Sequence, residues 1–183
     1  MNKHTGKLLI LGGFGIMTLT SLLSALIFFT RILLPNIFVA LFGLANVIAW
    51  LAVVLGFGVL FLANRNVLDL CLTIGFAATA FFRFISVGLG SSELLHVING
   101  MVFTGSGGLA SLILTVTFII WAVKLFKTTP LGSILVIASV ILPFFVTRLI
   151  FVIFGLSYFT TAIALIAEIA LISFRPIAAY LDM

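Results

Sequence analysis

The stretch that decides the fold is residues 37–63, IFVALFGLANVIAWLAVVLGFGVLFLA, which contains no charged side chain. A helix that crosses a bilayer needs about 20 mainly apolar residues, so this stretch is long enough to span one. The whole chain of 183 residues has the same character, with 64% hydrophobic residues, 7% charged residues and a mean hydropathy of +1.48. Because soluble domains carry about 25% charged residues, the composition excludes a soluble globule. It also excludes a disordered chain.

Five further apolar runs accompany this stretch, and together they predict a single all-α membrane domain of six transmembrane helices. The approximate ranges are 8–30, 37–63, 68–89, 97–123, 131–155 and 158–174. The runs are apolar on all sides, whereas strands of a membrane β-barrel alternate polar and apolar residues. Every predicted loop is short, so we expect no soluble domain, and the first helix is too long to be a cleaved signal peptide.

The basic residues predict the orientation of this bundle. If the N-terminus is cytoplasmic, six of the nine basic residues lie on the cytoplasmic side, namely Lys3, Lys7, Arg65, Lys124, Lys127 and Arg175. Only Arg31 lies in an outer loop. Cytoplasmic loops are enriched in Lys and Arg, so we expect both termini to be cytoplasmic, in a plasma membrane or another energy-transducing membrane. The basic residues are scattered singly, so nucleic acid is not an expected partner.

Several residues near the ends of the predicted helices have expected structural roles. Trp121 and Tyr180 are predicted at the inner membrane interface and Tyr158 at the outer one, where aromatic side chains gather. Asp69 begins the third predicted helix, where an acidic side chain complements the helix dipole. Cys71, the single cysteine, excludes a disulfide scaffold and is expected to be a small apolar filler.

Three ionisable residues fall inside predicted spans: Arg83, Arg148 and Glu168. A charge at the centre of a membrane helix costs about 2.5–3.5 kcal/mol, so such residues usually face the bundle interior or a wet cavity. At 1.5 Å per residue, all three fall between the outer third and the midplane. The favoured contact is a Glu168–Arg148 ion pair, with Arg83 as the rival partner. The alternatives are an ion pair that only fixes helix packing, an anion held by the second arginine, and proton or ion coupling through Glu168.

Polar residues near these charges extend the candidate site. Thr161 lies on the same face of the sixth predicted helix as Glu168, seven residues earlier. Glu93 and His96 lie in the most polar outer segment and form either the rim of an outward-facing pocket or a solvated loop. Two such residues are too few for a metal site.

Two other polar or helix-breaking residues lie within spans. Pro143 in the fifth predicted helix is expected to produce a kink that helps to aim Arg148. Asn46 is expected to hydrogen-bond across the bundle.

The chain shows no catalytic pattern, because it lacks paired carboxylates, a His/Cys cluster and a glycine-rich phosphate motif. We therefore expect a non-enzymatic protein without cofactor or metal. The first hypothesis is binding or transport of a small anionic solute at an outer-half polar site formed by Arg83, Arg148, Glu168, Thr161, Glu93 and His96. The alternatives are a non-catalytic subunit or scaffold of a membrane complex and a small membrane receptor or sensor. The expected partners are the lipid bilayer, a small-molecule ligand, and another membrane protein or a second copy.

In size, six helices and cytoplasmic termini, the chain is similar to the substrate-binding subunits of energy-coupling-factor vitamin importers. Those subunits bind their ligand from the outer half. The similarity is one of overall plan, it carries over no functional residue, and the long outer binding loops of that group are lacking here.

Overall fold

The computed structural model of the chain describes residues 3–30, 36–88, 109–155 and 158–183. All regular structure in this part is helical, which confirms the predicted all-α class. The helices are α1 (Lys3–Thr30), α2 (Asn36–Asn64), α3 (Val67–Gly88), α5 (Leu109–Phe126), α6 (Pro130–Phe154), α7 (Tyr158–Ile172) and α8 (Phe174–Leu181). Much of the fourth predicted span lies outside the described residues.

Four helical stretches of the described chain are long and apolar enough to cross a membrane. They are Lys3–Ile27, Leu41–Asn64, Pro130–Phe154 and Phe159–Leu181. The described parts of α3 and α5 contain two shorter apolar helices, Val67–Phe81 and Leu112–Phe126. These lengths and compositions are those of a membrane protein.

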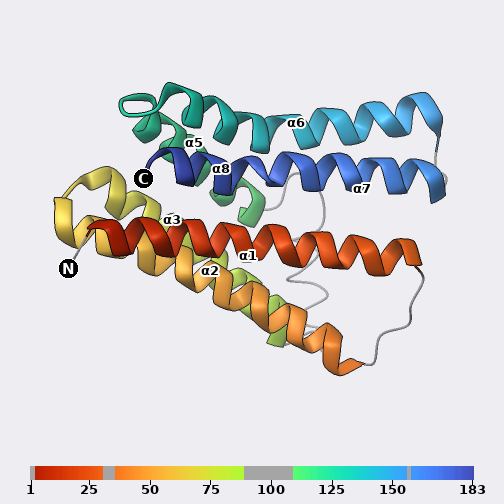
Figure 1. Cartoon of the computed structure of the whole chain (residues 1–183), viewed down its shortest axis with the longest axis horizontal. Coiled ribbons are helices and arrows are strands. Elements are labelled where there is room, and N and C mark those ends of the chain that lie inside the picture. The colour runs from red at the N-terminus through yellow and green to blue at the C-terminus, as the bar shows by residue number, and fades with distance from the viewer. Residues whose placement is uncertain (1–2, 31–35, 89–108, 156–157) are drawn as a thin grey trace.

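The last membrane-length stretch continues beyond the predicted end at Phe174. Helices α7 and α8 follow each other with only Ser173 between them and form one rod (Figure 1). The sequence Arg175-Pro176 was expected to mark the boundary of the span. Pro176 instead occupies the first turn of α8, where the absent N–H has no helical partner to lose. Arg175 therefore lies inside the same apolar helical stretch as Glu168.

Both termini lie at the same end of the bundle (Figure 1). Helix α1 packs against α2 and α8, α3 packs between α2 and α5, and α6 packs against α5, α7 and α8. The α2–α3 and α5–α6 turns also lie at the end that holds the termini (Figure 1). A chain that crosses a membrane an even number of times ends on the side where it began, and the six predicted spans would place the termini in this way.

Aromatic rings form the core in the half of the bundle that holds the termini. The Phe14 and Trp121 rings stack with centroids 5.0 Å apart, and those of Phe57 and Phe76 stack at 5.2 Å. Phe118 meets the edge of Phe76 at 5.4 Å. Trp121 is predicted near the inner membrane interface, but its side chain is only 2% exposed and is not part of an exposed aromatic belt. It instead fills the contact between α1, α2 and α5, because large rings supply most of the buried area in such a core.

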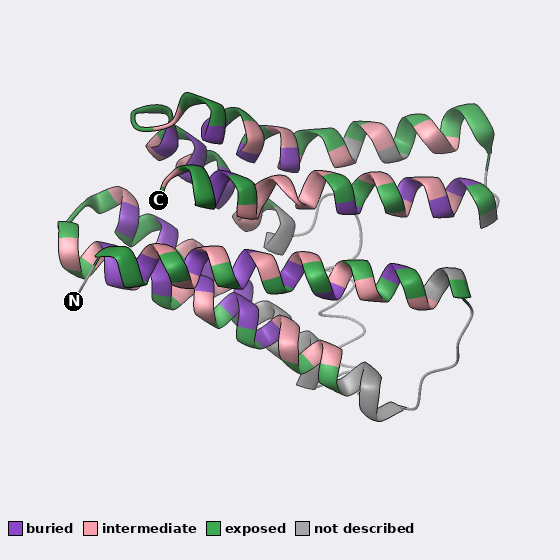
Figure 2. Cartoon of the chain, viewed as in Figure 1, coloured by how far each residue is buried: buried purple, intermediate pink, exposed green. Residues whose placement is uncertain are grey.

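The outer surface of the bundle is apolar. Figure 2 shows exposed residues along the outer edge of α6 and buried residues on the edge that faces the other helices. Large apolar side chains such as Leu55, Phe145 and Val152 are 60–82% exposed. A continuous exposed apolar surface of this kind is suited to lipid rather than water.

Glycines bring α1 and α2 into close contact. A Cβ atom on Gly13 would lie 2.6 Å from the Ala49 carbonyl oxygen and 2.6 Å from Cγ2 of Val53. A Cβ atom on Gly56 would lie 2.7 Å from the Gly6 carbonyl oxygen. Small residues let membrane helices approach closely, which replaces the hydrophobic driving force that lipid removes.

Replacing Gly13 by alanine is therefore expected to lower the free energy of unfolding by about 1–2 kcal/mol, because the new methyl group overpacks the contact. Gly12 is the control, since a Cβ there meets nothing within 4 Å. Gly12→Ala should leave stability unchanged or raise it slightly through better helix propensity. Thermal unfolding in detergent, followed by tryptophan fluorescence, measures both. An equal loss in the two variants would contradict the close approach at Gly13.

The end that holds the termini contains two ion pairs. Asp69, which is completely buried, contacts Lys124 and accepts a hydrogen bond of 3.3 Å from the Asn64 amide. Asp69 was expected only to complement a helix dipole, but its main contact is a long-range partner on α5. Asp182 pairs with Lys7 at 3.5 Å and so ties the C-terminal residues to α1.

Cys71, two residues beyond Asp69 in α3, is exposed. Its prediction as a buried filler is wrong, because this side of the helix faces outward. As the only cysteine of the chain, it is removed by one substitution, Cys71→Ser.

Candidate functional site

Glu168 on α7 lies where two pockets meet. Leu165, Glu168, Ile169 and Ile172 share one face of α7, because their spacing follows the helical repeat. Glu168 and Ile172 line both pockets, one toward α1 and α2 and the other toward α5 and α6. Among the residues that the structure describes, the ion pairs are Lys7–Asp182 and Lys124–Asp69. Glu168 has no basic partner in that part of the chain.

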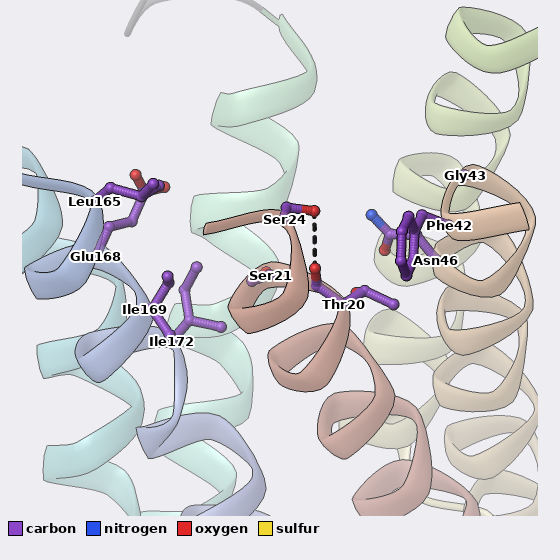
Figure 3. A pocket seen from close by; sticks show the side chains of 10 residues that line it. All are labelled: Thr20, Ser21, Ser24, Phe42, Gly43, Asn46, Leu165, Glu168, Ile169 and Ile172. Atoms are coloured by element: carbon purple, nitrogen blue, oxygen red, sulfur yellow. Dashed lines mark hydrogen bonds between the residues drawn. The ribbon is translucent and has the colours of Figure 1, made fainter. Parts of the chain in front are cut away.

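The larger pocket, of about 380 Å³, is called the hydroxyl pocket here. Its walls are Thr20, Ser21 and Ser24 of α1, Phe42, Gly43 and Asn46 of α2, and Leu165, Glu168, Ile169 and Ile172 of α7. Figure 3 shows α1 between the other two helices, with Asn46 pointing from α2 toward α1 and Ile169 and Ile172 pointing toward α1 from the other side. The α1 and α2 residues come from the halves of their helices that are remote from the termini.

The three hydroxyl groups of this pocket donate their hydrogen bonds to backbone carbonyls of α1. Thr20 and Ser21 each donate to the Met17 carbonyl at 2.9 Å, and Ser24 donates to the Thr20 carbonyl at 2.8 Å. The Ser24 bond is drawn in Figure 3. A carbonyl oxygen can only accept, so in each bond the hydroxyl is the donor. While these bonds are made, the hydroxyl oxygens are able only to accept a hydrogen bond from a ligand in the pocket.

The smaller pocket, of about 160 Å³, is called the arginine pocket here. Its walls are Leu114, Thr115 and Phe118 of α5, Ser139, Val140 and Pro143 of α6, and Glu168, Ile172 and Arg175 of the α7–α8 rod. Glu168 and Arg175 are seven residues apart, which is close to two helical turns and places them on one side of the rod. The rise of an ideal helix separates them by about 10 Å along the axis.

Arg175 is held by groups on two neighbouring helices. Its guanidinium carbon lies 4.4 Å from the centre of the Phe118 ring. Its Nε donates to Ser139 Oγ and its Nη2 donates to the Ser139 carbonyl, both at 3.4 Å. These contacts fix a positive charge between α5, α6 and α8.

Pro143 explains why the Ser139 carbonyl needs a donor from outside its helix. In α6 that carbonyl would normally accept from the N–H of residue 143, four positions later. Proline has no N–H, so the carbonyl is left without its helical partner. Membrane helices tolerate proline when neighbouring groups bind the freed carbonyl, and here the guanidinium of Arg175 does so. Pro143 was expected to aim Arg148, but the structure connects it to Arg175.

Arg148 lies on a different side of α6. It is nine residues, or two and a half turns, beyond Ser139, which places the two on opposite faces of the helix. Its side chain is exposed and lines neither pocket. The expected Glu168–Arg148 pair is not among the ion pairs of the described residues.

The other predicted site residues are less informative. Thr161 is half-buried on α7 and lines neither pocket. The side chain of Arg83 lies outside the described part of the chain. The same is true of Glu93 and His96.

The sequence contains a signal for one of the residues that the prediction does not include. Arg175-Pro176 predicts the end of a span, but the spacing of seven residues between Glu168 and Arg175 places both on one helical face. Thr20, Ser21 and Ser24 were not singled out, because isolated hydroxyl residues are common in membrane helices. The side to which a hydroxyl points depends on helix rotation, which a uniformly apolar sequence does not reveal.

The described residues contain no group of three or more His, Cys, Asp or Glu side chains that is able to hold a metal ion. No known protein family matches the chain, and no curated protein and no solved structure matches it either.

Proposed function

We propose that this chain is a non-enzymatic, multi-pass membrane protein that binds a small polar solute inside its bundle and moves it across the bilayer. The observation that carries the proposal is that Glu168 lines both the hydroxyl pocket and the arginine pocket. A carboxylate within a membrane helix is costly, and such residues mark substrate or ion pathways. The oxygen-lined hydroxyl pocket supplies the polar surroundings that offset this cost.

The two pockets are displaced along the α7–α8 rod in a way that fits a path. The hydroxyl pocket involves residues 165–172 of the rod, and the arginine pocket involves residues 168–175, nearer the termini. A solute that enters the hydroxyl pocket meets Glu168 and then Arg175. Secondary transporters commonly bind their substrate inside the bundle, near the middle of the bilayer.

The proposed orientation places the termini in the cytoplasm. Lys3 and Lys7 belong to the first turns of α1, Arg65 to the α2–α3 turn, and Lys124 and Lys127 to the end of α5 and the turn after it. These segments lie at the end of the bundle that holds the termini (Figure 1). The positive-inside rule assigns that end to the cytoplasm. The hydroxyl pocket then lies in the outer half, and the bundle belongs in a plasma membrane or another energy-transducing membrane.

A thiol-accessibility experiment tests whether the hydroxyl pocket is open to water. In the Cys71→Ser background, which removes the only cysteine, Ser24→Cys is expected to react with a neutral, water-soluble methanethiosulfonate. The control is Leu26→Cys, two residues further along α1, where the leucine is 51% exposed on the apolar outer surface. Its thiol should stay protonated in lipid and react at least about tenfold more slowly, because the thiolate is the reactive form.

Labelling is measured by mass spectrometry on the full chain in liposomes. Reaction of Ser24→Cys that is no faster than reaction of Leu26→Cys would overturn the proposed water-filled binding pocket.

A further inference from the structure

We infer that the hydroxyl pocket binds a small organic cation that carries N–H donors, of the primary ammonium class. This assignment rests on the proposed function and adds the charge and hydrogen-bonding class of the solute. It differs from the anionic solute that the sequence alone favours.

The first support is the hydrogen-bonding character of the walls. The hydroxyl hydrogens of Thr20, Ser21 and Ser24 are committed to carbonyls of α1, so these groups offer only lone pairs to the pocket. An ionised carboxylate such as that of Glu168 also only accepts. A ligand that supplies donors therefore satisfies these groups, whereas an anion would find donor groups only in the amide of Asn46.

The second support is charge. Glu168 is the ionisable residue of the hydroxyl pocket, and no described basic residue lines that pocket. The anionic hypothesis assigned the anion to Arg83 or Arg148; Arg148 lines neither pocket, and the side chain of Arg83 lies outside the described part of the chain. Arg175 lines the arginine pocket instead and is engaged with Ser139 and Phe118.

The third support is the mixed character of the remaining walls. Phe42 lines the pocket, and an aromatic ring attracts a cation that lies over its face within about 6 Å of its centre. Leu165, Ile169 and Ile172 provide an apolar surface for a short hydrocarbon chain. The volume of about 380 Å³ lies at the lower end of the range for small-molecule sites, which is about 300–1,000 Å³.

Ligand binding tests this directly, with n-butylammonium as the probe and butyrate as its anionic counterpart. In the detergent-solubilised full chain, n-butylammonium is expected to raise the unfolding temperature as its concentration rises, and butyrate is not. Glu168→Gln should raise the Kd for n-butylammonium about tenfold or more, since one charge-assisted hydrogen bond is lost. Ser24→Ala should raise it by a smaller factor.

Thr18→Ala is the control variant. Thr18 donates to the Phe14 carbonyl in the same way as the pocket hydroxyls, but it does not line the pocket. Its Kd should be unchanged. Stabilisation by butyrate equal to that by n-butylammonium would overturn the inference. Unchanged binding in both Glu168→Gln and Ser24→Ala would overturn it as well.

A second measurement separates this inference from the proposed function. The Ser24→Cys variant in the Cys71→Ser background is labelled with a cationic and an anionic methanethiosulfonate, with Glu168 present and with Glu168→Gln. We expect the cationic reagent to react faster, and the preference to fall with Glu168→Gln. Equal rates for the two reagents would overturn the cationic assignment alone. Failure of both reagents and of the neutral one would overturn the proposed function.

Discussion

Replacing Asp69 by leucine while Lys124 is retained is expected to lower the free energy of unfolding by about 3–5 kcal/mol. The Asp69 side chain has 0% exposure and that of Lys124 has 17%, so the pair is largely shielded from water. Asn64 donates to the second carboxylate oxygen, and the Lys124 ammonium lies 5.6 Å from the centre of the Phe57 ring. Loss of the carboxylate leaves the ammonium buried without its counter-charge.

The double variant Asp69→Leu/Lys124→Met distinguishes a lost pair from lost packing. Replacing both charges by apolar groups of similar volume is often neutral or stabilising. We therefore expect the double variant to recover most of the stability lost by Asp69→Leu. Denaturant titration in detergent micelles, followed by the fluorescence of Trp50 and Trp121 in the core, measures the free energies.

Asp182→Asn is the comparison at the other ion pair. The side chains of Lys7 and Asp182 are 28% and 14% exposed, so water screens this pair more than the first. Loss of this ion pair should lower the free energy of unfolding by only about 1 kcal/mol or less. If Asp69→Leu costs no more than Asp182→Asn, or if the double variant is as unstable as the single one, the buried pair does not stabilise the fold.

The all-α class was predictable because a bilayer restricts the secondary structures that a spanning chain is able to adopt. A backbone in lipid must satisfy its hydrogen bonds internally, so long apolar runs such as residues 37–63 become helices. The gathering of basic residues at the end of the bundle that holds the termini was also predictable, because these residues lie between the apolar runs. Their assignment to the cytoplasm stays a prediction. The Asp69–Lys124 pair was not, because 55 residues separate its members and nothing local indicates that they meet.

The candidate site was only partly predictable for a related reason. Counting residues gives the depth of Glu168 and Arg148, but a helix that is apolar on all sides gives little information about its rotation. Arg148 therefore seemed a natural partner for Glu168, although it lies on the opposite face of α6 from Ser139. Arg175 was missed because the adjacent Pro176 looked like the end of the helix, whereas α8 starts there.

The second large effect is expected at Arg175. Arg175→Met should lower the free energy of unfolding by about 2–4 kcal/mol, because the freed Ser139 carbonyl then lacks a donor and the contact with Phe118 loses its charge. Ser139 itself is completely buried, so water does not readily replace the guanidinium. Methionine keeps the unbranched stem and much of its packing.

Pro143→Ala provides the background that isolates this cause. Alanine restores an N–H at position 143, which is able to donate to the Ser139 carbonyl and complete the helical bond. In this background the loss of unfolding free energy caused by Arg175→Met should be smaller than in the native chain by at least about 1 kcal/mol. A coupling of this size is within the range seen for residues that share a partner. The four proteins of this cycle are compared by denaturant titration. If Arg175→Met costs the same with Pro143 and with alanine at that position, then Arg175 stabilises the bundle through contacts other than the carbonyl that proline frees.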